Sequence, residues 1–369
     1  MNRSTFRRAA VPAALALTFG LASCSGSNEA GSTTASEGSS SSSLSGSLNG
    51  AGASTQTVAQ QQWAADFNGT NPDVTLNYDP VGSGGGRTQF LQGGVPFAGS
   101  DAYLKDEELT QAEQRCNGGN AMDLPVYISP IAIAFNLPGV ESLNLSPATV
   151  ANIFAGTITT WNDPAIAAEN AGVQLPATTI TPVHRSDDSG TTENFTDYLH
   201  ATAPDAWTAE ADGAWPLQGG EAAQGTSGVV QALQAGEGAI GYADESQVAP
   251  TGLGTVSVKV GDAYVGPTAE AAAAAVDAST QVEGRPEGDI AIELDRTTTA
   301  DGAYPVVLVS YDIVCSSYED ENQGALVKAY MEYVVSEDGQ QAAAKAAGSS
   351  PISDDLREQI TESLDRIGS

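Results

Sequence analysis

Apolar residues along the chain gather in short runs that alternate with segments of helical periodicity. Four runs are typical of β-strands, namely VTLNYDPV (74–81), PVYISPIAIAFNLP (125–138), TTITPVHRS (178–186) and YPVVLVSYDIV (304–314). We expect Pro130 to break the second run, because proline cannot donate a hydrogen bond to a sheet. The last run is expected to form either one long strand or a pair of strands.

Helical segments lie between and after these runs. The clearest is LSPATVANIFAG, where Ser146 stands at the N-cap, Pro147 at the first helical position and Gly156 after the last turn. Further helices are expected at RTQFLQG (87–93), FTDYLH (195–200), the first part of 225–244, TAEAAAAAVDAS (268–279), QGALVKAYMEYVVS (323–336) and GQQAAAKAAG (339–348). The rest of 248–303 has no readable pattern. This alternation predicts α/β layers in place of a β-sandwich.

Length and charge narrow the class of protein. A chain of 369 residues predicts two domains, and 41% hydrophobic residues are enough for a sizeable core. The 46 acidic residues outnumber the 14 basic ones, which gives a formal net charge of −32. This balance argues against a nucleic-acid partner, because binding to a phosphate backbone needs clustered Lys and Arg.

The N-terminal residues are not expected to belong to the fold. MNRSTFRRAA is a basic start, VPAALALTFGLA is an apolar run too short to span a bilayer, and LASC ends at Cys24. Residues 1–23 are therefore interpreted as a signal peptide. LASC resembles the lipobox of bacterial lipoproteins, which implies cleavage before Cys24 and lipid attachment to its sulfur. An ordinary cleaved signal peptide is the alternative.

The residues after Cys24 are rich in Ser and Gly and are too polar to pack a core. We interpret 24–46 as a flexible tether. Together with the lipid anchor, this tether predicts an exported protein attached to the outer face of the cell membrane.

Cys116 and Cys315 are the two remaining cysteines. Exported proteins often pair such cysteines, so we expect a disulfide. Two buried thiols are the alternative.

Three turns are rich in glycine and hydroxyl residues: NGAGAST (49–55), GSGGGRTQF (82–90) and HRSDDSGTT (184–192). At least the last two are expected to join a strand to the start of a helix. A helix N-terminus exposes free N–H groups and the positive end of the helix dipole, so it binds anions. For any one turn alone, simple helix capping explains the Ser and Gly equally well.

The sequence gives little support for a nucleotide-binding, metal-binding or catalytic site. GSGGGR lacks the last glycine of a dinucleotide-binding loop, and no lysine follows at P-loop spacing. His184 and His200 are the only histidines, and no cysteine–histidine cluster has zinc spacing. We therefore expect neither enzyme activity nor a cofactor.

Several stretches together resemble the phosphate-binding component of bacterial phosphate-specific ABC transporters. They are GSGGGRTQF, FAGSDAYLKDEEL, LSPATVANIFAGTITTWNDPAI, HRSDDSGTTENFTDYL and GAIGYAD, in the same order as in that family. The resemblance implies a type II periplasmic-binding-protein fold, with two α/β domains joined by a two-crossing hinge and a ligand cleft between them. The implied domain I is discontinuous, 47–128 and 305–369, and domain II is 129–304. A Cys116–Cys315 bridge would lie in domain I or near the hinge.

The resemblance also implies a ligand set of hydroxyls, backbone N–H groups, one arginine and one carboxylate. The implied phosphate-binding residues are Ser54, Thr55, Ser83, Asp101, Arg185, Ser189, Gly190 and Thr191. Asp187 matches an acidic residue that flanks the arginine. Thr55 departs from the family, which usually has an aromatic residue here, although its backbone N–H still matches a contact. Asp188 stands where the family tends to have a small residue.

Asp101 is the informative member of this set. A carboxylate beside an anion is favourable only if the ligand has a proton to donate, which phosphate has at neutral pH and sulfate does not. We therefore expect a phosphate receptor that acts with an ABC permease and ATPase, as a monomer. The alternatives are a receptor for another tetrahedral oxyanion such as sulfate or molybdate, an exported phosphohydrolase that uses Ser83 or Ser189, and an adhesion or signalling protein with a degenerate cleft.

Overall fold

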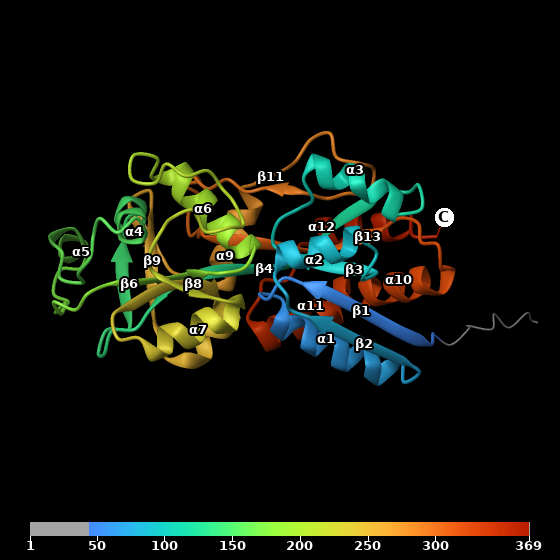
Figure 1. The fold of residues 1–369 in the computed structure, drawn as a ribbon, viewed down its shortest axis with the longest axis horizontal. Coiled ribbons are helices and arrows are strands. Elements are labelled where there is room, and N and C mark those ends of the chain that lie inside the picture. Colours follow the sequence, from blue (N-terminus) through green and yellow to red (C-terminus); the bar gives the residue numbers. More distant parts are fainter. Residues whose placement is uncertain (1–43, 369) are drawn as a thin grey trace, which may run out of the picture. The chain divides into compact units, whose positions relative to one another are not determined.

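The structure, a computed structural model, describes residues 44–368, and its main feature is one long mixed sheet (Figure 1). The strands follow the order β2 (Val74–Asp79), β1 (Gly46–Gly52), β3 (Phe97–Ser100), β13 (Val307–Cys315), β4 (Ala121–Phe135), β8 (Ala239–Asp244), β6 (Thr181–Arg185) and β7 (Glu221–Ala223). A branch from β4 consists of β9 (Gly254–Val260), which pairs with β5 (Ser142–Leu145) and β10 (Ala263–Val265). Two short strands, β11 (Thr280–Gln281) and β12 (Ile292–Glu293), pair only with each other.

The strand β4 lies in the middle of this order, and all 15 of its residues are buried. Its first part pairs antiparallel with β13, from Ala121 opposite Cys315 to Pro130 opposite Val307. Its last five residues pair antiparallel with β8. We call β2, β1, β3 and β13 the β1 side of the sheet, and β8, β6, β7 and β9 the β8 side. The strand β4 therefore belongs to both sides of the sheet.

Helices accompany both sides (Figure 1). Those beside the β1 side are α1 (Thr57–Thr70), α2 (Ser83–Leu91), α3 (Asp106–Arg115), α10 (Glu321–Val335), α11 (Glu337–Ala347) and α12 (Asp354–Leu364). Those beside the β8 side are α4 (Pro147–Phe154), α5 (Pro164–Glu169), α6 (Gly190–Thr202), α7 (Gly225–Ala235) and α8 (Glu245–Val248) with the 3₁₀ turn η1 (Ala249–Thr251). The remaining helix, α9 (Ala269–Asp277), packs on β4 and β13.

Most of the expected elements are present, and the α/β prediction is confirmed. The Ser146 hydroxyl accepts a hydrogen bond from the Thr149 N–H at the start of α4, as its sequence predicts. The run at 304–314 forms the single strand β13. The helix α12 and the strands of 248–303 were not anticipated, although residues alternate between buried and less buried along β9 and Leu356, Ile360 and Leu364 recur every four residues in α12.

The prediction that Pro130 breaks its run was wrong. Pro130 is the last residue of β4 that pairs with β13, and Ile131 is the first that pairs with β8. The proline thus stands where β4 exchanges one neighbour for another, a position at which a missing N–H disturbs the sheet least.

The disulfide is confirmed: Cys116, just after α3, is bonded to Cys315 at the end of β13. Both cysteines are buried, and the bridge ties two elements of the β1 side. Within 44–368, no helix is both long and apolar enough to cross a bilayer. The signal peptide, Cys24 and the tether up to residue 43 lie outside the described residues.

Candidate anion-binding site

All three glycine- and hydroxyl-rich turns join a strand to a helix, namely β1 to α1, β2 to α2 and β6 to α6. The first turn passes close to β3: a Cβ on Gly52 would lie 1.9 Å from the Gly99 carbonyl oxygen, so only glycine fits. Beyond it, Ser54 faces the β8 side, and its Oγ accepts a hydrogen bond from the Thr226 N–H at 3.0 Å. The Thr55 hydroxyl donates to Asp101 Oδ1 at 2.6 Å.

The second turn brings Ser83 to Asp101. Ser83 is the first residue of α2, and Asp101 directly follows β3. The Asp101 N–H donates to Ser83 Oγ at 3.1 Å. The first two turns and the end of β3 therefore converge at one place.

The third turn supplies the cationic group and a helix N-terminus. Arg185 ends β6, and Ser189 caps α6 by accepting a hydrogen bond from the Thr192 N–H at 3.3 Å. Gly190 and Thr191 are the first residues of α6. The Arg185 side chain is held by Asp187, whose Oδ1 accepts from Nε at 2.8 Å.

These residues meet across the two sides of the sheet. Thr191 Oγ1 donates to Asp101 Oδ2 at 3.0 Å, and Arg185 Nη1 lies 3.4 Å from the same hydroxyl. A Cβ on Gly190 would lie 2.9 Å from Ser83 Oγ, so the N-termini of α6 and α2 are in close contact. The predicted side-chain ligands are all at most 5% exposed: Ser54, Thr55, Ser83, Asp101, Arg185, Ser189 and Thr191.

Burial and hydrogen bonding set the charges of this cluster. Burial raises the pKa of Asp101, and the hydrogen bonds from Thr55, Ser310 and Thr191 together with the Arg185 charge oppose that rise. Burial also acts to raise the pKa of Asp187, but the hydrogen bonds and charge of Arg185 outweigh it and the pKa lies below its usual value. Asp187 is thus held as a carboxylate that pairs with Arg185.

The two other polar residues of the third turn have structural contacts. The Asp188 carbonyl accepts a hydrogen bond from the Gly84 N–H at 3.2 Å, while its side chain is 59% exposed. The His184 ring stacks on Trp215, with centroids 5.0 Å apart, and its ring nitrogens contact backbone carbonyls. Neither residue belongs to an arrangement of nucleophile and base.

Comparison with known proteins identifies the family. Residues 33–338 match the PBP superfamily domain. The phosphate-binding protein PstS 3 of Mycobacterium leprae is 35% identical over 326 residues, which cover 87% of this chain and 86% of the relative. The chain belongs to the phosphate-binding protein family.

Other comparisons agree with this assignment to the phosphate-binding protein family. PstS 2 of Mycobacterium tuberculosis is 37% identical over 294 residues, covering 78% of this chain and 79% of the relative. A high affinity periplasmic phosphate-binding protein solved with phosphate has a similar fold, with a TM-score of 0.69 at 23% identity, covering 86% of this chain and 93% of that one. The predicted periplasmic-binding-protein fold is thereby confirmed.

The sequence motifs did not predict several residues that belong to this cluster. Ser310 on β13 donates to Asp101 Oδ1 at 2.7 Å, and the Asn194 side-chain amide donates to the Asp101 carbonyl at 2.7 Å. Thr226 reaches Ser54 from the start of α7. A serine inside the apolar run VVLVSYDIV is the one local sign that could have marked Ser310.

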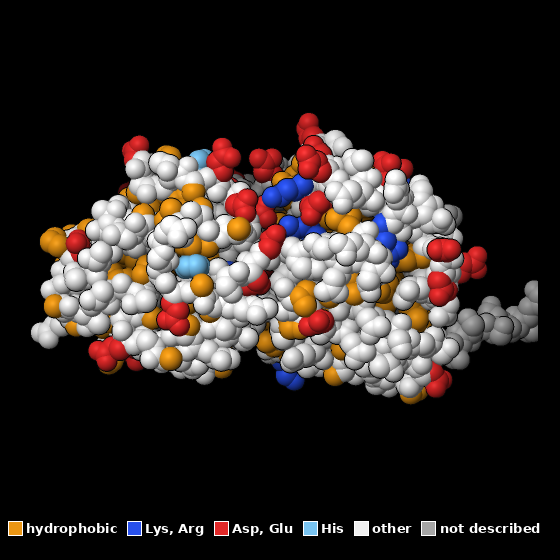
Figure 2. All heavy atoms as spheres, viewed as in Figure 1, with side chains coloured by type: hydrophobic (Ala, Val, Ile, Leu, Met, Phe, Trp, Pro, Cys, Tyr) orange, Lys and Arg blue, Asp and Glu red, His pale blue; other side chains and the backbone are white. Residues whose placement is uncertain are grey.

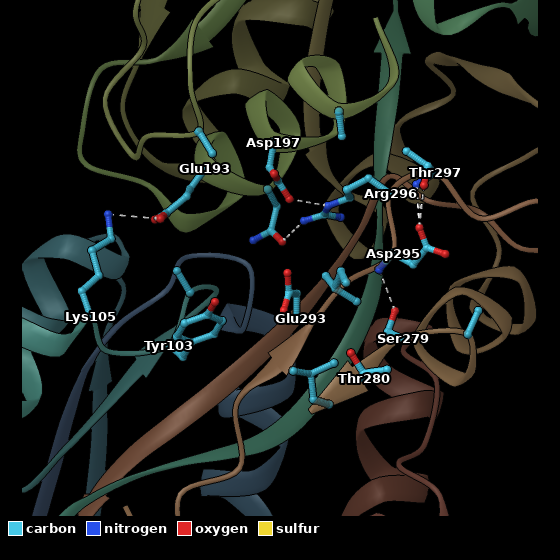
Figure 3. A pocket seen from close by; sticks show the side chains of 17 residues that line it. Tyr103, Lys105, Glu193, Asp197, Ser279, Thr280, Glu293, Asp295, Arg296 and Thr297 are labelled. Atoms are coloured by element: carbon cyan, nitrogen blue, oxygen red, sulfur yellow. Dashed lines mark hydrogen bonds and ion pairs between the residues drawn. The ribbon is translucent and has the colours of Figure 1, made fainter. Parts of the chain in front are cut away.

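A cavity of about 730 Å³ lies beside this cluster, between α6 and the residues around β11 and β12 (Figure 3). Lys105 and Glu193 point toward each other across it and form an ion pair at 3.2 Å. The buried Arg296 pairs with Asp197 at 2.8 Å and donates to the Asn194 side-chain oxygen. Since guanidinium groups only donate, this contact directs the Asn194 NH₂ group toward Asp101.

Proposed function

We propose that this chain binds inorganic phosphate outside the membrane and delivers it to the permease of an ABC transporter. The ligand groups are Ser54, Thr55, Ser83, Asp101, Arg185, Ser189, Gly190 and Thr191, with Asp187 holding the arginine. The names and sequence identities of the PstS relatives support the family role. The convergence of three strand–helix turns on Asp101 and Arg185 supports the ligand set.

The cluster has the chemistry of a buried anion site. An anion removed from water needs donors in place of its hydration shell, and two helix N-termini, several hydroxyls and one guanidinium are gathered here. Arg185 is 3% exposed, and its charge is partly balanced by Asp187. The site therefore accepts an anion without a large excess of local positive charge.

The buried carboxylate of Asp101 is the single observation that favours phosphate over other oxyanions. Its carboxylate is 3% exposed and accepts hydrogen bonds from hydroxyls on both sides of the sheet. An anion beside it must bring a proton, and HPO₄²⁻ does so while SO₄²⁻ cannot. A buried carboxylate left unpaired next to a like charge can discriminate by as much as ~10⁴ to 10⁵.

The contacts between the two sides of the sheet support capture by closure. Domain I (47–128 and 305–369) and domain II (129–304) supply different ligand groups, which meet in the pairs Thr191–Asp101 and Ser54–Thr226. We propose that these domains close over the ligand about the two places where the chain crosses between them, one within β4 and one at residues 304–305, just before β13. The chain acts as a monomer, without a cofactor, held at the outer face of the membrane by lipid on Cys24.

Calorimetric titration with phosphate, arsenate and sulfate tests this function. Phosphate and arsenate should bind tightly and sulfate much more weakly, whereas sulfate binding as tightly as phosphate would refute the role of Asp101. Turnover of a chromogenic phosphate ester by the pure protein would instead support the phosphohydrolase.

The salt dependence of binding provides a second test. Acidic side chains are spread over the face shown in Figure 2, with far fewer lysines and arginines, so long-range attraction of an anion is not expected. Because local donors hold the ligand, phosphate affinity should fall less than about threefold as ionic strength rises from about 0.01 to 0.15 M. A steep loss of affinity would contradict capture by local dipoles.

A further inference from the structure

The carboxylate of Asp101 is surrounded by hydrogen-bond donors. Its Oδ1 accepts from Thr55 at 2.6 Å and from Ser310 at 2.7 Å, and its Oδ2 accepts from Thr191 at 3.0 Å. A hydroxyl can rotate and act as an acceptor instead. The charge of Asp101 therefore depends on whether anything fixes the direction of these hydroxyls.

The Ser310 hydroxyl is fixed by Gln56. Gln56 is fully buried, and its Nε2 donates to Ser310 Oγ at 2.8 Å and to the Tyr311 carbonyl oxygen at 3.1 Å. A carbonyl oxygen can only accept, so the amide must present its NH₂ group at this end. The Ser310 oxygen accepts one of these hydrogens, and its own hydrogen is directed to Asp101.

The other end of Gln56 is fixed by a second amide. The Gln60 Nε2 donates to Gln56 Oε1 at 2.8 Å, and the Tyr330 hydroxyl donates to Gln60 Oε1 at 2.7 Å. The Gln60 Nε2 also lies 3.2 Å from Asp312 Oδ2. All these residues are buried, and the hydrogen bonds from Tyr330 through Gln60, Gln56 and Ser310 run in one direction. This series of hydrogen bonds ends at the Asp101 carboxylate.

We propose that Ser310 and Gln56 are specificity-determining positioning residues, which hold Asp101 as an ionised acceptor for the proton of the bound oxyanion. A proton on Asp101 Oδ1 would meet the Ser310 oxygen, which already accepts from Gln56 and whose own hydrogen faces the carboxyl. The Ser310 hydrogen bond therefore favours the ionised form and opposes the burial that raises the pKa of Asp101. This inference rests on the proposed function and explains how Asp101 keeps the charge on which selectivity depends.

Other groups that act on Asp101 electrostatically are Arg185 on β6, Asp244 on β8 and Tyr78 on β2. Arg185 favours the carboxylate, whereas a charged Asp244 disfavours it. On β13, Asp312 contacts the Gln60 amide, and burial raises its pKa to about 7. All these groups are the same in the wild type and in a Ser310 variant. A difference in the pH dependence of binding between the two proteins therefore reports on the hydroxyl.

The test compares Ser310→Ala with wild type by calorimetric titration of phosphate and of sulfate from pH 5 to 8. A hydrogen bond to a charged group is lost, so the ratio of sulfate Kd to phosphate Kd should fall roughly 10-fold or more. The pKa of Asp101 rises, so the weakening of phosphate binding on acidification should begin about one pH unit higher. The ionisation of phosphate itself is common to both proteins and cancels.

Two further variants separate this role from a structural one. Ser310→Thr keeps a hydroxyl on the strand and should retain the selectivity and pH profile of the wild type. Ser363→Ala removes a buried hydroxyl in α12 that donates a hydrogen bond to the Gln359 carbonyl, and it should leave binding unchanged. Thermal unfolding of each variant confirms that the fold is retained.

The outcomes are distinct. If Ser310→Ala weakens phosphate and sulfate equally, or leaves both the Kd ratio and the acid limb unchanged, the inference is wrong although the chain still binds phosphate. If the wild type itself does not bind phosphate, the proposed function fails instead.

Discussion

Gly190 is the first residue of α6 and lies directly against Asp101, so the effect of adding a methyl group there can be worked out from the structure. A Cβ at this position would lie 2.7 Å from Asp101 Cβ and 3.0 Å from the Asp101 carbonyl carbon. The first distance falls about 0.7 Å short of the 3.4 Å at which ordinary contact begins. Gly190→Ala must therefore separate the N-terminus of α6 from Asp101.

The displacement involves backbone, which cannot rotate away. Overpacking of this kind costs about 1–3 kcal/mol, and misplacing binding groups by ~1 Å has an effect of similar size. We expect phosphate binding by Gly190→Ala to be about 10- to 100-fold weaker, with little change in the fold. Calorimetric titration with phosphate measures this loss.

Two glycine variants serve as controls for Gly190→Ala. Gly69 in α1 has no atom within 4 Å of an added Cβ, so Gly69→Ala should bind phosphate normally and be slightly more stable. A Cβ on Gly84 would meet the Asp188 side chain at 2.2 Å, but that side chain is 59% exposed and can turn into solvent. Gly84→Ala should therefore lose much less affinity than Gly190→Ala. Wild-type affinity in a folded Gly190→Ala protein would refute the close contact between α6 and Asp101.

Four further predictions concern charge and covalent structure. Arg185→Ala should cost most of the phosphate affinity in calorimetry, since the site then lacks its cation; near-normal binding would show that backbone donors suffice. Asp101→Asn should bring sulfate affinity closer to that of phosphate, because an amide can donate as well as accept, and unchanged selectivity would contradict its role. Burial raises the pKa of Asp312 to about 7, above the value of about 3.9 expected for the unfolded chain. The native state therefore binds more protons, and the free energy of unfolding should fall as the pH rises from about 4 to about 7. Burial also raises the pKa of Asp244 to about 6 and that of Glu245 to about 7, which acts in the same direction. Asp312→Asn should therefore make the fall shallower in denaturant titrations, and an unaltered slope would mean that Asp312 does not contribute. Replacing Cys116 and Cys315 with alanine should lower the free energy of unfolding by about 2–5 kcal/mol, because their bridge closes a long loop; an unchanged unfolding midpoint would show that the bridge is dispensable.

The three glycine- and hydroxyl-rich turns could be predicted from the sequence because their determinants are local. The cap of α6 at Ser189 and the glycines that open α2 and α6 are legible in a few consecutive residues. The disulfide was likewise anticipated from composition alone. The family resemblance then implied that the three turns contribute to one ligand set.

The supporting contacts could not be predicted, because they join positions far apart in sequence. Ser310 and Gln56 are separated by 254 residues and meet only because β13 inserts between β3 and β4. Arg296 lies in the unreadable segment 248–303, yet it fixes the amide of Asn194 from α6. Pro130 was misjudged for the same reason: a strand's change of neighbour is a property of the sheet, and local propensity does not encode it.

The position of β13 also governs when the chain can fold. This strand is built from residues 307–315, but it lies between β3 and β4, which end at residues 100 and 135. The sheet of the β1 side therefore lacks an inner strand until nearly the whole polypeptide is available, and pairings of such long sequence separation form slowly. A chain ending before Val307 would expose β3 and β4 as open edges, prone to pair with other molecules. Completion of the β1 side is thus expected to follow synthesis of β13, long after β1, β2 and β3 have been made.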